Sequence, residues 1–224
     1  QNFAKAFDIT FTDSKGKQQH VWQNTFAIST RMLGVLFAVH SDDKGLVLPP
    51  KIAQTQVVIV PILFDDSKEK VLKEGEIIRD SLVKQGLSVH IDDREGYSPG
   101  WKFNEWEMKG VPVRIELGPK DLEKKHAMIA RRDTGDKKAV ALKDVAGEVV
   151  GLMETIQASL LKKAKKHLKD NIVEVATYKE AEKKLEQSKI VYVPWCGHTH
   201  CEESLKEKTG AKSLNSPLKQ PKIT

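Results

Sequence analysis

Residues 100–110 interleave aromatic and charged side chains in a way that suits unpaired nucleic-acid bases. The stretch reads GWKFNEWEMKG and continues directly into VPVRIELGPKD at 111–121. Aromatic rings stack on exposed bases, while Glu, Asp, Arg and Lys hydrogen-bond to base edges. A carboxylate accepts from the N1–H and N2–H groups of guanine, and a cation donates to guanine O6 and N7. The alternative is that Trp101, Phe103 and Trp106 pack as core and that the charges are solvated.

A second candidate site is a loop in which Cys196, His198, His200 and Cys201 lie close together. Zinc binds Cys and His in tetrahedral sites, and a structural site uses four ligands. One short loop supplying all four would be strained, so a loop with this spacing would more readily supply two ligands, with two more coming from elsewhere. The alternative is a pair of free thiols beside exposed histidines. No Ser-His-Asp or catalytic cysteine arrangement is evident.

Composition and charge narrow the class of protein. The 224 residues are 39% hydrophobic and carry a net charge of +6. A basic surface favours polyanions such as nucleic acid, although plain solubility would explain the same charge. No apolar run approaches the roughly 20 residues of a membrane span, and no secretory signal is visible, so we expect a reducing, cytoplasmic location. Because the chain starts at Gln1 without a methionine, we expect a piece of a longer protein.

Residues 1–48 predict a strand, a turn, a second strand and a helix. Phe7, Ile9 and Phe11 alternate with polar residues, as in a half-buried strand. The second strand is expected over 20–28, and Thr30 can cap a helix that follows. A hairpin plus one helix is too small to fold well alone, so we interpret this region as the tail of a larger domain.

Residues 49–157 predict an α/β domain. The apolar run 57–60 is typical of a strand buried on both faces. A helix over 67–85 and a strand over 88–91 complete a βαβ unit, which makes the two strands parallel with a right-handed crossover. Residues 92–112 are expected to form a long polar loop. Strands over 113–117 and 126–132 follow, and Asp144 can cap a long helix through Leu160.

Residues 158–224 predict a small, charged α+β domain. A basic stretch is followed by a charged helix over 177–187 and by a strand over 190–194 that leads into the two cysteines. The polar end, 208–224, is expected to be poorly ordered.

Several stretches together resemble prolyl-tRNA synthetases of the archaeal and eukaryotic type. The matching anticodon-domain stretches are GWKFNEWE at 100–107, KGVP at 109–112, ELGPKD at 116–121 and RRDTG at 131–135. STR at 29–31 with LG at 33–34 is similar to motif 3 of class II synthetases, and GLVLPP at 45–50 to the exit from the catalytic domain. VPWCGHTHC at 193–201 and GAKSL at 210–214 are similar to the C-terminal zinc domain.

This resemblance implies an activity and a set of partners. The activity is ATP-dependent activation of L-proline, with Mg²⁺, followed by transfer to tRNA(Pro). Two guanines end the proline anticodon, and the resemblance assigns their recognition to Glu107, Arg114, Lys120 and Asp121, with Phe103 beside them. A homodimer is expected for the full-length enzyme, and no membrane partner is expected.

The resemblance also assigns residues outside the anticodon domain. Arg31 would contact an ATP phosphate, which agrees with its place at a helix N-terminus. Ser29 and Phe26 would line the proline and ATP pocket, although the family usually has Trp where this chain has Phe26. Cys196 and Cys201 would be zinc ligands, but Asn215 stands near a position where some relatives have Cys, so the zinc-type domain is incomplete.

The fold class that follows is α/β in three parts: a remnant of a class II antiparallel catalytic sheet at 1–48, a mixed-sheet anticodon-binding domain at 49–157, and the zinc-type domain at 158–224. Motifs 1 and 2 are absent, so we do not expect this chain alone to activate proline. Two alternatives remain open: a non-catalytic tRNA-binding module derived from a synthetase anticodon domain, and a zinc-dependent interaction protein centred on the cysteine loop.

Overall fold

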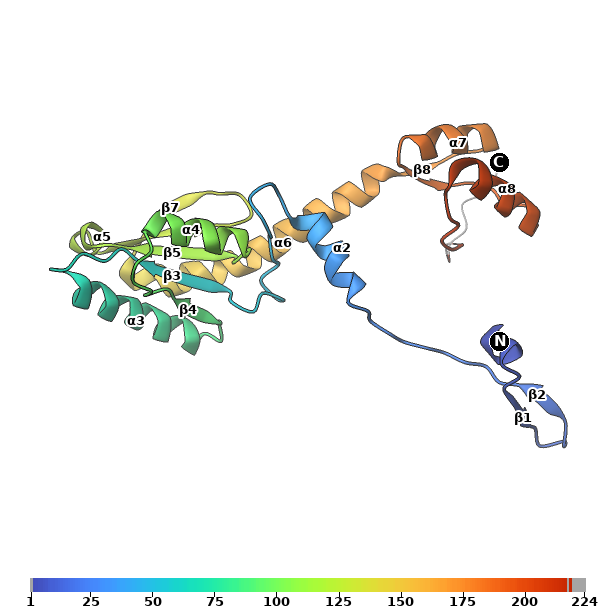
Figure 1. Cartoon of the computed structure of the whole chain (residues 1–224), viewed down its shortest axis with the longest axis horizontal. Helices are drawn as coiled ribbons and strands as arrows, with labels where there is room; N and C mark the ends of the chain where they lie inside the picture. The colour runs from blue at the N-terminus through green and yellow to red at the C-terminus, as the bar shows by residue number, and fades with distance from the viewer. Residues whose placement is uncertain (1, 217, 219–224) are drawn as a thin grey trace. The chain divides into compact units, whose positions relative to one another are not determined.

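The computed structural model describes residues 2–216 and 218, and it divides the chain into two compact units (Figure 1). One unit comprises residues 1–38 and the other residues 39–224. Each unit is described by itself below.

A five-stranded mixed sheet forms the centre of the larger unit, with strand order β4-β3-β5-β6-β7. The strands are β3 (Val57–Pro61), β4 (Val89–Ile91), β5 (Val113–Leu117), β6 (His126–Arg131) and β7 (Lys137–Ala141). β3 pairs in parallel with both β4 and β5, whereas β5, β6 and β7 are antiparallel neighbours. This confirms the mixed-sheet α/β fold class and the parallel βαβ pair. β7 was not predicted, because its sequence is short and largely exposed.

Helices cover both faces of this sheet. α3 (Lys68–Lys84) and α6 (Val145–Asn171) pack against the face that carries Val57 and Ile59. α4 (Pro99–Met108) packs against the other face, where Val58 and Val60 contact it. Successive residues of a strand point to opposite faces, so every residue of β3 is buried, as its apolar run predicts. α3 and α4 therefore lie on opposite sides of the sheet (Figure 1).

The expectation of a long polar loop over 92–112 is wrong, because α4 occupies much of it. Ser98 is the N-cap, and its Oγ accepts from the backbone N–H of Trp101 at 3.2 Å. Pro99 takes the first helical position, where its missing N–H costs nothing. The Ser-Pro start was therefore readable in the sequence, but the mixed aromatic and charged composition of the helix hid its period.

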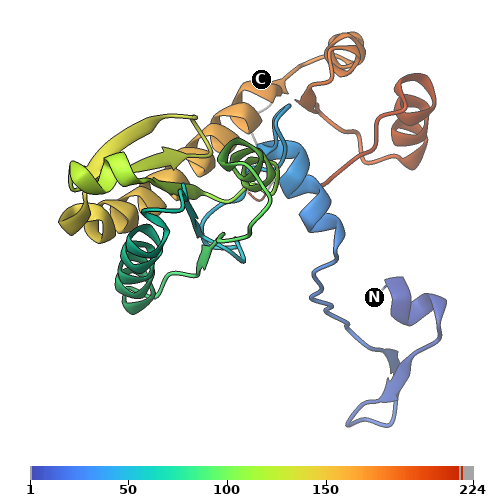
Figure 2. The same cartoon turned by 60° about the vertical axis from the view of Figure 1, so that its left-hand side comes forward.

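Short helical segments and one long helix complete the larger unit's core. α5 (Pro119–Glu123) follows β5, and the 3-10 helix η1 (Leu142–Asp144) precedes α6. α6 runs without a break from the sheet to the C-terminal region (Figure 2). It is longer than predicted and crosses the expected division at residues 157 and 158, and that division stays a prediction.

The C-terminal region is a small α/β arrangement. β8 (Ile172–Glu174) pairs in parallel with β9 (Ile190–Tyr192), and α7 (Tyr178–Glu186) connects them. Thr177 and Glu180 form a capping box at the start of α7, which confirms the predicted charged helix. α8 (Thr199–Thr209) follows the cysteine loop and was not predicted. Of the expected disordered end at 208–224, residues 217 and 219–224 lie outside the described residues.

The smaller unit contains α1 (Asn2–Ala6), the antiparallel pair β1 (Thr10–Thr12) and β2 (Gln18–His20), and most of α2 (Arg31–His40). An antiparallel hairpin and a helix are confirmed, but the bounds of both strands are wrong. β1 contains only Phe11 of the predicted Phe7, Ile9 and Phe11 and is exposed, not half-buried, and the second strand ends at His20 instead of Ile28. Residues 21–29, all described, take no regular structure. A strand needs a partner for its backbone groups, and here Phe26 and Ile28 are 95% and 89% exposed. That the hairpin is a remnant of a larger sheet stays a prediction.

None of the helices in the described part of the chain is long and apolar enough to cross a membrane.

Candidate nucleic-acid interface

A buried aspartate fixes α4 to the sheet. Asp92 follows β4 and is fully buried. Its carboxylate accepts from Arg94 Nε at 2.8 Å, from Arg94 Nη2 at 2.7 Å and from Trp106 Nε1 at 2.7 Å. Lys102 Nζ, also buried, lies 3.7 Å from Asp92 Oδ1 and donates to the Asp92 carbonyl oxygen at 2.9 Å. Trp106 and Lys102 both belong to α4, so this one carboxylate anchors the helix.

The charges around Asp92 keep it ionised. Burial alone would raise the pKa of Asp92, but the hydrogen bonds from Arg94 and Trp106 and the charge of Lys102 hold that pKa well below its usual range. The carboxylate therefore stays negative at neutral pH, and α4 is held by an ionic and hydrogen-bonded network inside the protein.

The aromatic residues of α4 divide into core and surface. Trp106 is buried and packs with Val58 and Val60, as the core alternative expects. Trp101 is 44% exposed and stacks on Tyr97, with ring centroids 4.2 Å apart. Phe103 is partly buried and faces a hollow beside the helix. The aromatic stretch thus anchors the helix with one ring and offers others at the surface.

The hollow beside α4 has a volume of about 340 Å³, within the range of roughly 300–1,000 Å³ that is common for small-ligand pockets. Three of the predicted anticodon residues line it together: Phe103, Glu107 and Arg114. The cationic lining residues are Lys44, Arg114, Arg131, Arg132 and Lys137. One carboxylate among several cations makes a hollow suited to a polar ring attached to a phosphate backbone.

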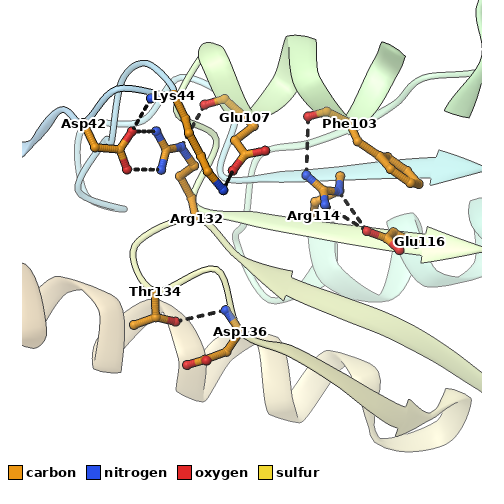
Figure 3. Close-up of polar contacts among 9 residues, drawn as sticks. All are labelled: Asp42, Lys44, Phe103, Glu107, Arg114, Glu116, Arg132, Thr134 and Asp136. Atoms are coloured by element: carbon orange, nitrogen blue, oxygen red, sulfur yellow. Dashed lines mark hydrogen bonds and ion pairs between the residues drawn. The ribbon is translucent and has the colours of Figure 1, made fainter. Parts of the chain in front are cut away.

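Arg114 is held in a fixed orientation on β5. Its Nε and Nη2 donate to Glu116 Oε1 at 3.1 and 2.9 Å, and its guanidinium lies over the Phe103 ring, 4.5 Å from the centroid (Figure 3). Lys137 Nζ donates to the same Glu116 oxygen at 2.7 Å. Glu116 is 8% exposed and holds the two cations in place beside the hollow. Arg114 and Phe103 form part of the wall of the hollow.

Glu107 lies at the C-terminal end of α4 with its carboxylate at the hollow. Lys44 Nζ lies 3.1 Å from Glu107 Oε1, and the Glu107 side chain is 24% exposed (Figure 3). Arg132 Nε donates to the Glu107 carbonyl oxygen at 2.8 Å. Hydrogen bonding from Arg132, aided by other nearby groups, lowers the pKa of Asp42 to about 2. The Asp42 carboxylate is therefore ionised beside Arg132 at neutral pH.

Lys120 and Asp121 lie apart from this hollow. They belong to α5, beyond the C-terminal end of β5, and are not among the residues that line it in the described part of the chain. Asp121 Oδ2 accepts from the Gly118 backbone N–H at 2.8 Å, so the carboxylate also caps α5. The four predicted guanine-reading residues thus form two groups, one at the hollow and one on α5.

The predicted proline and ATP residues lie in the smaller unit. Arg31 is the first residue of α2, which confirms its position at a helix N-terminus. Phe26, Ser29 and Arg31 are all exposed. Their assignment to a proline and ATP pocket stays a prediction.

The cysteine loop provides two thiols that shift the pKa of one another. The His198 backbone N–H, followed by the Cys201 thiol, lowers the pKa of Cys196, and the hydrogen bond with Cys196 raises the pKa of Cys201. Both thiols are exposed. No group of three or more potential ligands exists among the described residues, and a structural zinc site needs four. The described residues do not complete a zinc site.

Sequence reasoning missed several residues of the hollow. Lys44, Arg132 and Lys137 line the hollow, and Glu116 accepts hydrogen bonds from Arg114 and Lys137 beside it. These residues come from separate segments, and only the fold brings them together. RRDTG at 131–135 was noted as a resemblance, and Arg131 and Arg132 within it line the hollow. For Glu116, its alternation with Arg114 on one strand was a usable signal, since residues two apart share a face.

A mixed sheet with a cation-lined hollow beside an aromatic helix defines an anticodon-binding domain, and comparison with known proteins supports this class. The family model described as "Anticodon binding domain" matches residues 56–152, and that described as "Prolyl-tRNA synthetase, C-terminal" matches residues 178–224. The chain belongs to the prolyl-tRNA synthetase family and corresponds to its C-terminal portion.

Curated relatives cover this chain from end to end. It is 44% identical to "Proline--tRNA ligase 2" of Clostridioides difficile (strain 630) and 46% identical to "Proline--tRNA ligase" of Alkaliphilus oremlandii (strain OhILAs), over 100% of the chain and 46% of each relative. It is 41% identical to "Proline--tRNA ligase, cytoplasmic" of Arabidopsis thaliana, over 43% of that protein. The chain therefore spans slightly less than half the length of these relatives.

Proposed function

We propose that this chain is the tRNA-recognising portion of a proline–tRNA ligase. The observation that carries the proposal is the single hollow in which Phe103, Glu107 and Arg114 converge from α4 and β5. Its cationic lining favours an RNA backbone. In this proposal the ligand is the anticodon loop of tRNA(Pro).

The side chains of the hollow match one guanine. The Glu107 carboxylate accepts from guanine N1–H and N2–H, Arg114 donates to O6 and N7, and Phe103 stacks beside the ring. Lys120 and Asp121, farther along the chain from β5, would then read the adjacent guanine. Two separated groups of side chains suit two splayed bases better than one pocket would.

The activity of the whole protein follows from its relatives. We propose ATP-dependent activation of L-proline, with Mg²⁺, and transfer to tRNA(Pro), in the cytoplasm and as a homodimer. Arg31 would bind an ATP phosphate, and Phe26 and Ser29 would line the proline and ATP pocket. The apolar side chains exposed in the smaller unit, Phe26 and Ile28 among them, would pack against the remainder of a catalytic domain. Cys196 and Cys201 supply only two of the four ligands that a structural zinc site uses.

Glu107→Ala in the intact synthetase tests the recognition role. We expect tRNA(Pro) charging, measured as kcat/KM, to fall roughly 5- to 150-fold, because one base-reading contact contributes about 1–3 kcal/mol of discrimination. Proline-dependent ATP–pyrophosphate exchange should be unchanged, because that reaction does not use tRNA. Glu76→Ala is the matched control, since Glu76 is an exposed carboxylate on α3 across the sheet from α4.

Equal losses in charging and in exchange would contradict the role of Glu107, since they would indicate general damage to the enzyme. Normal charging by the Glu107→Ala enzyme would remove the carboxylate from guanine recognition altogether.

A further inference from the structure

The segment 42–48, which follows α2 in the chain, is joined to the C-terminal end of α4 by backbone hydrogen bonds. The Leu46 N–H donates to the Met108 carbonyl oxygen at 3.0 Å, and the Leu48 N–H donates to the Gly110 carbonyl oxygen at 3.2 Å. These bonds join the 42–48 segment to the end of α4 that carries Glu107, although the two lie about 60 residues apart in the sequence.

Two glycines allow this close approach. A Cβ atom at Gly45 would lie 2.6 Å from Met108 Cα, and a Cβ atom at Gly110 would lie 2.6 Å from the Leu46 carbonyl oxygen. Both glycines also have positive φ angles, +129° and +75°, which side chains rarely adopt. The 42–48 segment and the end of α4 thus fit against each other with no space for movement toward one another.

Charged side chains of the same segment then restrain Glu107 directly. Arg132 Nη1 and Nη2 donate to the two Asp42 oxygens at 2.8 and 2.5 Å, and its Nε donates to the Glu107 carbonyl oxygen (Figure 3). Lys44 Nζ holds the Glu107 carboxylate. Arg132 is buried, with a side-chain exposure of 4%, so its planar fork is fixed and defines where the Glu107 backbone lies.

We propose that Asp42, Lys44 and Arg132 are positioning residues for guanine recognition, which act by presetting the backbone and the carboxylate of Glu107. The inference rests on the proposed role of Glu107. A glutamate that is already ordered loses less side-chain freedom when a base binds, so preorganisation strengthens binding. Lys44 contacts one carboxylate oxygen, and the remaining lone pairs of the two oxygens can accept from guanine N1–H and N2–H.

The test is the specificity ratio of the 224-residue chain for two RNAs, measured by fluorescence anisotropy. One RNA is the anticodon stem-loop of tRNA(Pro), and the other has adenine in place of its two guanines. The ratio of the two Kd values cancels the contribution of phosphate contacts, which both RNAs share. We expect Asp42→Ala and Lys44→Met each to lower this ratio about two- to tenfold, the effect of one side chain losing its preorganisation.

A double-mutant cycle separates positioning from general structural support. If Asp42 acts through Glu107, then Asp42→Ala should lower the ratio in the wild-type background and leave it unchanged in a Glu107→Gln background. A further drop in the Glu107→Gln background would overturn the inference. If Glu107→Gln lowers the ratio and Asp42→Ala does not, the inference alone fails. If Glu107→Gln has no effect, the proposed role of Glu107 and the inference fail together.

Two controls test whether a change in the ratio arises from loss of the fold or from loss of a positive charge. Asp42→Ala leaves Arg132 without its carboxylate, so circular dichroism must confirm the native fold, and Lys44→Met supplies a second variant at a side chain that is 67% exposed. Lys84→Met, on α3 across the sheet from α4, removes the same charge and should leave the ratio unchanged. Equal weakening of both RNAs by Lys44→Met would show a phosphate contact and would overturn its positioning role.

Discussion

Replacing Asp92 with alanine should lower the free energy of unfolding by about 3–5 kcal/mol, the cost of breaking a buried ion pair by removing one partner. The variant leaves Lys102, which is 3% exposed, with a buried ammonium and no carboxylate. It also removes the acceptor of the Trp106 indole N–H. Urea denaturation followed by circular dichroism would measure the loss, which is large against the marginal stability of a domain.

Asp80→Ala is the matched control for this prediction. Asp80 pairs with Arg79 on the surface of α3, with a side-chain exposure of 59%, and exposed pairs of this kind contribute about 0–1 kcal/mol. Asp92→Asn separates the two causes, because an amide can still accept from Trp106 but has no charge for Lys102. If Asp92→Ala proves no more damaging than Asp80→Ala, the carboxylate is not the anchor of α4.

The unfolding free energy measured at acidic pH provides an independent check on Asp92. Its folded-state pKa is lowered, so the carboxylate contributes stability that is fully present above its unfolded pKa of about 3.9. That contribution is lost as the pH falls through the lower folded-state pKa. Asp92→Asn should therefore flatten the fall in unfolding free energy below about pH 4.

The sheet was predictable because burial leaves a pattern in the sequence. β3 could be recognised from the continuous apolar run 57–60, and α3 from apolar residues at helical spacing that end at Gly86. The same pattern made the second strand of the smaller unit too long in the prediction. Its apolar residues were read as buried, but burial requires a partner surface, and no partner strand pairs with the described residues 21–29.

The hollow was predictable only in part. Glu107 and Arg114 came from a resemblance in a continuous stretch, and the fold does bring them to one site. The restraints on them come from distant segments: Lys44 is 63 residues from Glu107, and Lys137 is 21 residues from Glu116. No local spacing encodes such pairs. The mixed role of the aromatic residues was also hidden, because the sequence does not reveal that Asp92 lies within reach of Trp106 Nε1.

Arg114→Ala should weaken binding of the tRNA(Pro) anticodon stem-loop to the 224-residue chain by roughly 100-fold, near the upper end of the range of about 1–3 kcal/mol for a base-reading arginine. The guanidinium is already oriented by Glu116 and by the Phe103 ring, so little of its interaction energy is lost to ordering. Its removal also leaves Glu116 at the edge of the hollow with Lys137 as the remaining hydrogen-bonded cation. Anisotropy titrations at several salt concentrations would give both the affinity and its salt dependence.

Arg114→Lys distinguishes base reading from simple charge. A lysine keeps the positive charge but lacks the planar fork that pairs with guanine O6 and N7, so we expect it to retain the salt dependence of the wild type and to lose most of the preference for guanine. Arg79→Ala, on the opposite face of the sheet, removes one charge without touching the hollow and should change affinity by less than about twofold. A wild-type guanine preference in Arg114→Lys would mean that Arg114 meets the RNA backbone, because a phosphate accepts either cation while a guanine edge favours the fork.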